Sequence, residues 1–322
     1  MTTATAAIAL PDSAIFETIP CYCCGSTSSM EFIVAQDDLT GKPGNFRFVT
    51  CDDCGLAYQN PRIAMDHIKS YYDDEYIAHR KKTDWGRLTW FYNLVMDRHD
   101  IDKDRIVRQY IHLGPQSEVL DVGCAVGTFL QKLRKLYGVR ASGVDFKDLS
   151  AHPGLEGVEF HCGLFYEQAL ARNRFDLVTM WHFLEHDYDP VRTLLTAKEV
   201  LKPGGRIVIE VPRLDSLTFR LYRERWPGLQ APQHTILFEK RTLLKLIEKS
   251  GLELVEYLPY GAFPPYFYVF AGAAFKLLKG RGLNLSKAIA PYFLGQIVML
   301  PVLLAERQLN LAMQTVICRK KL

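Results

Sequence analysis

The chain has 322 residues, enough for two or three domains of about 150 residues each, and its composition excludes several classes of protein. Hydrophobic residues make up 48% and charged residues 23%, and the mean hydropathy of -0.05 excludes both wholesale disorder and a polytopic membrane protein. The net charge of +3 is too small for a dedicated nucleic-acid-binding protein, so no nucleic-acid partner is expected.

The first region, residues 1–60, is rich in cysteine. Cys21 and Cys24 form one Cys-x-x-Cys-Gly pair, and Cys51 and Cys54 form a second. Two such pairs, each followed by a turn-forming glycine, are typical of a closed tetrahedral zinc site with four thiolate ligands. Cys23 is a surplus thiol that competes with Cys24, and the two-residue spacer favours Cys24. We therefore predict a small zinc-ribbon-like module with structural zinc on Cys21, Cys24, Cys51 and Cys54.

Two features indicate a cytoplasmic protein. Clustered cysteines fit a metal site in a reducing compartment better than a disulfide framework. The first lysine or arginine is Lys42, so the N-terminal segment lacks the charged start of a secretory signal.

Residues 61–114 have the pattern of a helical linker or cap. Leu88, Phe91, Tyr92 and Val95 recur at i, i+3, i+4 and i+7, which gives one apolar stripe with charges between its members. A Gly-Pro turn at 114–115 ends the region.

From residue 117 onward, short β-branched runs alternate with helical patterns. This alternation predicts an α/β fold with repeated βαβ units around a parallel sheet, in a domain of residues 115–260 and 309–322. We expect helices at 128–136, 190–201 and 241–250. Seven strands are expected at 118–122, 140–145, 158–162, 175–181, 206–211, 252–260 and 311–318.

Residues 119–128 predict a strand that runs through a tight turn into a helix. Gly123 and Gly127 let the backbone approach a ligand closely, and the helix N-terminus supplies free N–H groups to an anionic group. Asp145 ends the next strand about 20 residues further on, where a carboxylate accepts hydrogen bonds from ribose hydroxyls. Together these residues predict a site for a ribose-containing cofactor.

The motifs of this region resemble those of class I S-adenosylmethionine-dependent methyltransferases. The acid-x-Gly-x-x-x-Gly motif of that family reads DVGCAVG at 121–127, and the resemblance continues through FDLV at 175–178, FLEH at 183–186 and LKPGG at 201–205. The alternative is a Rossmann dehydrogenase, which has a Gly-x-Gly-x-x-Gly loop and no Lys-Pro-Gly-Gly turn. The resemblance implies a Rossmann-like seven-stranded sheet and S-adenosylmethionine as cofactor.

The resemblance also implies which residues contact the cofactor. The turn around Gly123 would hold the methionine part, Asp145 the ribose, and Cys162 and Gly163 the border of the adenine. Relatives often have an acid near position 162, so the alternative for Cys162 is a small core residue. Trp181 ends a strand on the side where cofactor and acceptor meet. The predicted cofactor-binding residues are Asp121, Gly123, Cys124, Gly127, Asp145, Cys162, Gly163 and Trp181.

Two histidines are candidate catalytic residues. His182, with Glu185 and His186, resembles the Glu-x-x-Glu-His cluster of ubiquinone-type O-methyltransferases, where acids and histidine can hold a metal; here a histidine replaces the first acid. For His186 we expect a buried ring bonded to a loop carbonyl. His234 resembles the histidine of a Glu-His pair that serves as general base in sugar C-methyltransferases, although Gln233 replaces the glutamate. We predict His234 as base or acceptor-positioning residue and His182 beside the transferred methyl; the alternative is that His234 only packs.

The N-terminal module has a resemblance of its own. With QNPR at 59–62 and YYDDEY at 71–76, it is similar to the zinc-binding part of methyltransferases from sugar and polysaccharide biosynthesis, where such a module covers the acceptor site. This makes Tyr76 a candidate substrate contact. Tyr71 and Tyr72 are expected to pack against the methyltransferase domain.

Residues 261–308 form a hydrophobic helical insertion. The stretches 257–275 and 288–305 contain no charged side chain and approach the length that spans a bilayer. Four basic residues between them and four prolines argue against a spanning hairpin, so we predict a pair of interfacial helices in peripheral contact with the membrane. The alternative is a helical cap or dimer interface.

These features predict methyl transfer to a sugar or lipid-linked glycan acceptor at the cytoplasmic membrane face. The alternatives are a soluble methyltransferase for a nucleotide-linked sugar and a catalytically silent scaffold that keeps the cofactor fold. Four arginines follow the fifth predicted strand, and they are either diphosphate ligands or a solvated helix face. They are Arg213, Arg220, Arg223 and Arg225.

Overall fold

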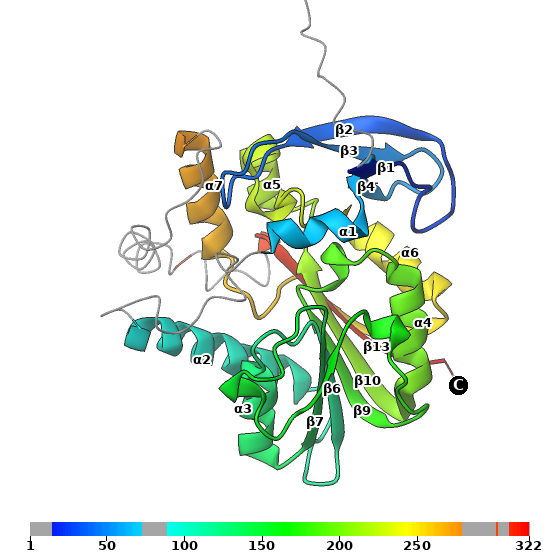
Figure 1. Cartoon of the computed structure of the whole chain (residues 1–322), viewed down its shortest axis with the longest axis vertical. Coiled ribbons are helices and arrows are strands. Elements are labelled where there is room, and N and C mark those ends of the chain that lie inside the picture. Colours follow the sequence, from blue (N-terminus) through cyan, green and yellow to red (C-terminus); the bar gives the residue numbers. More distant parts are fainter. Residues whose placement is uncertain (1–14, 73–88, 279–300, 302–308, 322) are drawn as a thin grey trace, which may run out of the picture.

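The computed structural model describes residues 15–72, 89–278, 301 and 309–321, with the backbone alone for 89–96. A seven-stranded sheet lies between helices, and a smaller four-stranded sheet lies across one end of it (Figure 1). The strand order of the large sheet is β12-β13-β10-β9-β6-β7-β8. The predicted Rossmann-like α/β fold with seven strands is therefore confirmed.

The large sheet is parallel over five strands and antiparallel at one side. Strands β6 to β10 run parallel, whereas β13 is antiparallel to both β10 and β12. The carboxyl ends of β6 to β10 therefore meet at one edge, where ligands of such sheets bind. The strands are β6 (Glu118–Val122), β7 (Arg140–Asp145), β8 (Glu159–Cys162), β9 (Phe175–Trp181), β10 (Leu201–Pro212), β12 (Leu252–Leu258) and β13 (Met313–Lys320).

Most strand bounds agree with the prediction, and β10 differs most. It begins at Leu201 instead of residue 206, because Leu201 already pairs with Phe175 before an irregular stretch that ends at Arg206. The LKPGG turn is thus part of the strand. β13 continues to Lys320 because Lys320 pairs with Leu252.

Helices cover both faces of the sheet (Figure 1). α2 (Thr89–Val107) and α3 (Thr128–Tyr137) lie on one face, and α4 (Pro190–Val200) and α6 (Lys240–Lys249) lie on the other. Alternate strand residues enter the two cores: Leu177 packs with Leu130 and Leu133 of α3, and Val178 packs with Leu194 of α4. The predicted apolar stripe of 88–95 lies outside the described side chains.

The N-terminal module is built from five short strands and one strand of the larger domain. β1 (Phe16–Glu17) pairs with β5 (Arg62–Ile63), which precedes α1 (Met65–Ile68). β2 (Ser29–Ala35), β3 (Phe46–Cys51) and β4 (Ala57–Gln59) form the small sheet, and β11 (Ile236–Leu237) completes it. One apolar core contains Cys51 and Leu56 together with sheet residues such as Leu120. The predicted boundary at residue 60 therefore does not separate two cores.

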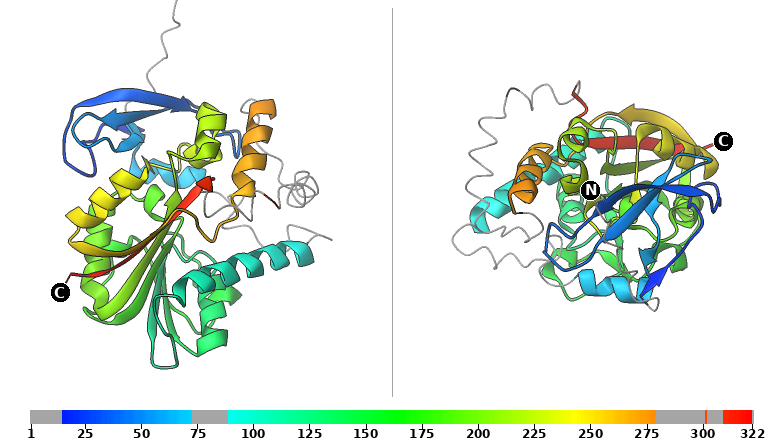
Figure 2. Two further views of the ribbon diagram at one scale, coloured as in Figure 1. Left: turned by 180° about the vertical axis from the view of Figure 1, so that it is seen from behind. Right: turned by 90° about the horizontal axis from the view of Figure 1, so that it is seen from above.

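The hydrophobic insertion begins with a helix that packs on protein. α7 (Tyr266–Leu278) lies beside α5 (Leu217–Tyr222), where Tyr222 donates a hydrogen bond to the carbonyl of Val269 at 2.7 Å (Figure 2). Its buried face includes Tyr268 and Phe275. The rest of the predicted helix pair, residues 279–300 and 302–308, lies outside the described residues. In the described parts of the chain, no helix combines the length and apolarity needed to cross a bilayer.

Candidate functional site

The turn between β6 and α3 is fixed by backbone hydrogen bonds. The N–H groups of Gly123 and Cys124 both donate to the carbonyl of Val144, at 2.8 and 3.1 Å. Gly123 and Gly127 have φ values of 75° and 74°, in the left-handed region that favours glycine. The predicted glycine turn thus lies at the carboxyl end of β6, beside β7.

Asp145 connects the ends of three strands. Its Oδ2 accepts the N–H of Ala125 at 3.0 Å and its Oδ1 accepts the N–H of Lys147 at 3.0 Å. Its carbonyl accepts the N–H of Gly163 at 2.8 Å, which holds the end of β8. Cys162 is exposed, so the alternative of a small core residue is wrong. Asp145, Cys162 and Gly163 therefore lie close together, as the family resemblance of these motifs implies.

Asp121 and Trp181 are buried polar groups at the same edge. Thr179 donates a hydrogen bond to Asp121 at 2.6 Å, and burial raises the pKa of Asp121 to about 6. Trp181 ends β9, and its buried Nε1 has no hydrogen-bond partner among the described residues. A buried N–H without a partner favours a ligand group beside it. Cys124 is buried too, near Gly143, where an added Cβ would lie 2.6 Å from its Sγ.

Gly127→Ala is expected to be far more harmful than the same change at Gly138. A Cβ at Gly127 would lie 2.7 Å from the carbonyl oxygen of Gly154, whereas one at Gly138 would have ordinary contacts of 3.5 Å or more with Pro115. Both glycines have left-handed φ values, 74° and 70°, so both substitutions cost about 1–2 kcal/mol of strain. The overlap adds about 1–3 kcal/mol at Gly127. Denaturant unfolding of the two variants measures the difference, and equal losses would contradict it.

His182 lies between two buried carboxylates. Its Nε2 is 3.1 Å from Glu210 and its Nδ1 is 3.4 Å from Glu185, and the two glutamate side chains are 0% and 1% exposed. Burial lowers the pKa of His182, but the two carboxylates outweigh this effect and raise the pKa to about 9. Glu210 was not predicted. Its signal was a lone acid inside the apolar strand β10.

His234 lies on the other side of Glu185. Its Nε2 is 4.0 Å from Glu185, and its Nδ1 is 2.8 Å from the carbonyl of Gly228. Burial lowers the pKa of His234 to about 3. Gln233 has no carboxylate, so the acid beside His234 is Glu185, from another segment of the chain. No local sequence motif indicates this pairing.

His186 is bonded to a loop carbonyl as predicted, but it is half-buried instead of buried. Its ring is 3.0 Å from the carbonyl of Gln233, and its segment leads into α4, which Asp189 caps by accepting the N–H of Arg192. The hydroxyl of Tyr72 is 3.0 Å from the same ring nitrogen. Tyr72 also packs on Phe146, after β7. Tyr72 thus contacts the domain that contains the large sheet, and Tyr76 lies outside the described residues.

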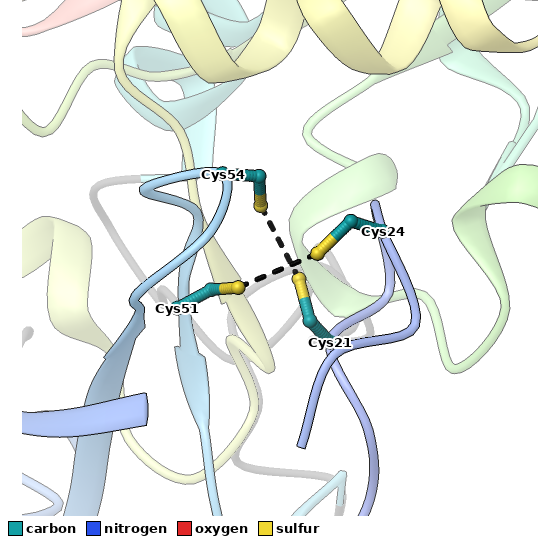
Figure 3. Close-up of side chains that lie close together, drawn as sticks. All are labelled: Cys21, Cys24, Cys51 and Cys54. Carbon is teal, nitrogen blue, oxygen red and sulfur yellow. Dashed lines mark hydrogen bonds between the residues drawn. The ribbon is translucent and has the colours of Figure 1, made fainter. Parts of the chain in front are cut away.

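The four predicted zinc ligands converge from two loops (Figure 3). The Sγ atoms of Cys21, Cys24, Cys51 and Cys54 all lie within 4.8 Å of one another, and two pairs are 3.4 Å apart. These separations exceed a disulfide bond of about 2.05 Å. They are close to the spacing of about 3.8 Å that four Zn–S bonds of about 2.3 Å give in a tetrahedron. Cys23 is outside the cluster.

Comparison with known proteins identifies a family model that matches this chain. A family model described as a methyltransferase domain matches residues 97–257, half of the chain. Among solved structures, geranyl diphosphate C-methyltransferase from Streptomyces coelicolor A3(2) has a TM-score of 0.48 and 12% identity, covering 71% of this chain and 80% of that chain. A SAM-dependent methyltransferase from Methanosarcina mazei has a TM-score of 0.44 and 16% identity, covering 67% and 97%.

Two curated relatives match shorter regions. An uncharacterized 37.1 kDa protein in transposon TN4556 of Streptomyces fradiae is 33% identical over 112 residues, 32% of each protein. A ubiquinone biosynthesis O-methyltransferase of Pseudomonas putida (strain W619) is 31% identical over 143 residues, 41% of this chain and 58% of that protein. The chain thus matches between about a third and three fifths of the length of these relatives.

Proposed function

Because the chain belongs to the methyltransferase-domain family, we propose that it transfers a methyl group from S-adenosylmethionine to a sugar or lipid-linked acceptor. The observation that carries the proposal is the grouping of Asp121, the glycine turn and Asp145 at the carboxyl ends of β6 and β7. The bound sulfonium cofactor supplies an electrophilic methyl group for in-line displacement. The protein's part is then largely positioning and removal of the acceptor's proton.

The buried polar groups at this edge fit the cofactor. We assign the methionine part to Asp121, Trp181 and the turn of Gly123, Cys124 and Gly127. Asp145 is assigned to the ribose, and Cys162 and Gly163 border the adenine. The unpartnered Nε1 of Trp181 and the left-handed φ values of Gly123 and Gly127 support this assignment.

The assignment of Asp121 predicts a pH dependence of cofactor affinity. Burial raises the pKa of Asp121 to about 6, so the carboxyl is increasingly protonated, and neutral, as pH falls below that value. A neutral carboxyl attracts the cofactor's ammonium group less. Affinity for S-adenosylmethionine, measured by calorimetry, is therefore expected to be highest near pH 7, where the carboxyl is ionised and the ammonium group is still protonated, and to fall up to about tenfold per pH unit below about 6.

Two variants test the source of this dependence. Asp121→Asn is expected to remove this part of the slope, because no carboxyl remains to titrate there. Asp176→Asn removes a carboxylate that pairs with Lys202 at the opposite end of the parallel strands, so the slope should remain. An unchanged slope in Asp121→Asn would refute the assignment.

His182 and His234 are proposed to act on the acceptor side. His182 follows β9 directly and is 22% exposed, which supports a position beside the transferred methyl. His234 was predicted as base or acceptor-positioning residue. Its side chain is 4% exposed and burial lowers its pKa to about 3, which supports the positioning role.

The acceptor class rests on the N-terminal module and the insertion. We propose a lipid-linked glycan at the cytoplasmic membrane face, with peripheral contact through 261–308. Two of the four candidate arginines already form ion pairs, Arg213 with Asp215 and Arg225 with Asp38. Arg220 and Arg223 are exposed, so these two are the proposed ligands of a diphosphate. A nucleotide-linked sugar and a silent scaffold are the alternatives.

We also propose structural zinc on Cys21, Cys24, Cys51 and Cys54. A closed set of four thiolates leaves no position for substrate, so the ion's part is to hold the two loops together.

Transfer of label tests the proposed function. Purified protein is incubated with methyl-labelled S-adenosylmethionine and an extract of cells that lack this protein. The products are then divided between organic and aqueous phases. Label in the organic phase is expected, and His234→Ala should reduce it. Label only in water would favour the nucleotide-linked sugar, and no label at all would favour the scaffold.

A further inference from the structure

A second group of metal-ligating side chains lies beside His182. Glu185 and His186 belong to the short 3₁₀-helix η6 (Leu184–His186), and His234 precedes β11. One ligand atom from each of the three lies within 4.8 Å of the other two. The proposed function assigns no ion to this cluster.

The backbone holds the two segments together without help from a ligand. Thr235 donates its N–H to the carbonyl of Glu185 at 2.8 Å and its hydroxyl to the carbonyl of Asp187 at 2.9 Å. From β4, the side chain of Gln59 donates to the carbonyl of His234 at 2.6 Å. The three side chains are therefore placed by the fold itself.

Both imidazoles are oriented by carbonyl groups. Nδ1 of His234 is 2.8 Å from the carbonyl of Gly228, and Nδ1 of His186 is 3.0 Å from that of Gln233. A carbonyl only accepts, so Nδ1 of His234 carries the hydrogen, and the neutral ring has its lone pair on Nε2. Nδ1 of His186 also lies 3.0 Å from the hydroxyl of Tyr72, which helps to orient that ring. Nε2 of His234 is 4.0 Å from Glu185. Metal-binding histidines are typically held in this way.

The negative charges at the cluster are only partly compensated, because His182 lies beside both Glu185 and Glu210. Neither oxygen of Glu185 accepts a hydrogen bond from a described residue, although both are buried. Glu210, by contrast, accepts the N–H groups of Ala262 at 2.6 Å and Phe263 at 3.0 Å. Even a protonated His182 offers one positive charge to two buried carboxylates. A buried carboxylate without hydrogen bonds is costly unless a cation is beside it.

We propose that Glu185, His186 and His234 bind a divalent transition-metal ion. Two imidazoles and one carboxylate suit zinc, iron, cobalt or manganese, whereas calcium and magnesium prefer oxygen ligands alone. The set differs from the Glu-x-x-Glu-His pattern, because His182 pairs with Glu210 and His234 is the third ligand. Three protein ligands leave a coordination position for water or an acceptor oxygen.

Cobalt(II) is the probe that distinguishes this site from the cysteines. Zinc-loaded wild-type protein is dialysed against Co²⁺, and both metals are counted by mass spectrometry. We expect one cobalt per chain in addition to the zinc, without the sulfur-to-cobalt charge-transfer band that thiolate ligands give. Glu185→Gln and His234→Gln should each weaken cobalt binding by at least about 100-fold. His161→Gln, on strand β8, is the matched control and should bind like wild type.

One measurement needs no substitution, because a variant that misfolds would also lose the ion. Pulsed electron paramagnetic resonance of cobalt-loaded wild-type protein should detect coupling to two imidazole nitrogens. Cobalt that binds only with the thiolate band, or that couples to no imidazole, would overturn the proposal. Binding is measured without methyl transfer, so an inactive protein with one such cobalt still supports the metal site.

Discussion

Asp145→Ala is expected to weaken the binding of S-adenosylmethionine about 100-fold. The change removes the carboxylate proposed for the ribose hydroxyls, where a hydrogen bond to a charged group contributes about 1.5–3 kcal/mol and each tenfold in affinity corresponds to about 1.4 kcal/mol. It also frees the N–H groups of Ala125 and Lys147, which the carboxylate holds at 3.0 Å each. Isothermal titration with the cofactor measures the loss.

Two further variants separate the causes of this loss. Asp148→Ala removes an exposed carboxylate three positions along the same loop and should bind the cofactor like wild type. Asp145→Asn keeps an acceptor oxygen for the backbone and loses the charge, so an intermediate affinity is expected. Unchanged affinity in Asp145→Ala would count against the ribose assignment.

Removal of the proposed zinc is expected to destabilise the whole chain in one transition. The cysteine cluster shares an apolar core with the large sheet, and Lys249 of α6 donates to the carbonyl of Cys23. Structural zinc contributes roughly 10 kcal/mol or more in small domains, and 1 kcal/mol shifts Tm by about 2–4 °C in a chain of this class. We expect chelation to lower Tm by more than about 10 °C and to weaken cofactor binding at the same time.

Neighbouring cysteines provide the control for this prediction. Cys24 is exposed and belongs to the cluster, whereas Cys23 is buried and does not. Cys24→Ser should lose zinc and stability, and Cys23→Ser should keep one zinc per chain. Two separate unfolding transitions after chelation, with cofactor binding intact, would mean that the module folds independently.

The sequence predicted the sheet because its signals are local. Every strand of the large sheet except β8 contains β-branched residues, and helices have boundary residues beside them, such as Gly138 after α3 or Asp189 before α4. Glycine conformation and helix capping depend on neighbours in the chain. The glycine turn and Asp145 could be paired from sequence because successive parallel strands place their carboxyl ends together.

The partners of the histidines could not be predicted in this way. His234 faces Glu185, and His182 faces Glu210, across segments that are distant in sequence. In the Glu-His pair that the His234 segment resembles, the acid directly precedes the histidine, at position 233, where this chain has glutamine. The hydrogen bonds of Thr235 to Glu185 and Asp187, together with the bond between His186 and Gln233, join the two loops and bring the acid to the ring.

By itself, the sequence determined the strands, the glycine turn after β6 and the four clustered cysteines, because each depends on residue spacing within one or two adjacent elements. The tertiary structure alone decided that β11 completes the small sheet, that both parts share a core, and that Glu185, His186 and His234 converge. Such contacts depend on the path of the whole chain, and hydrophobic periodicity carries no information about which distant segments meet.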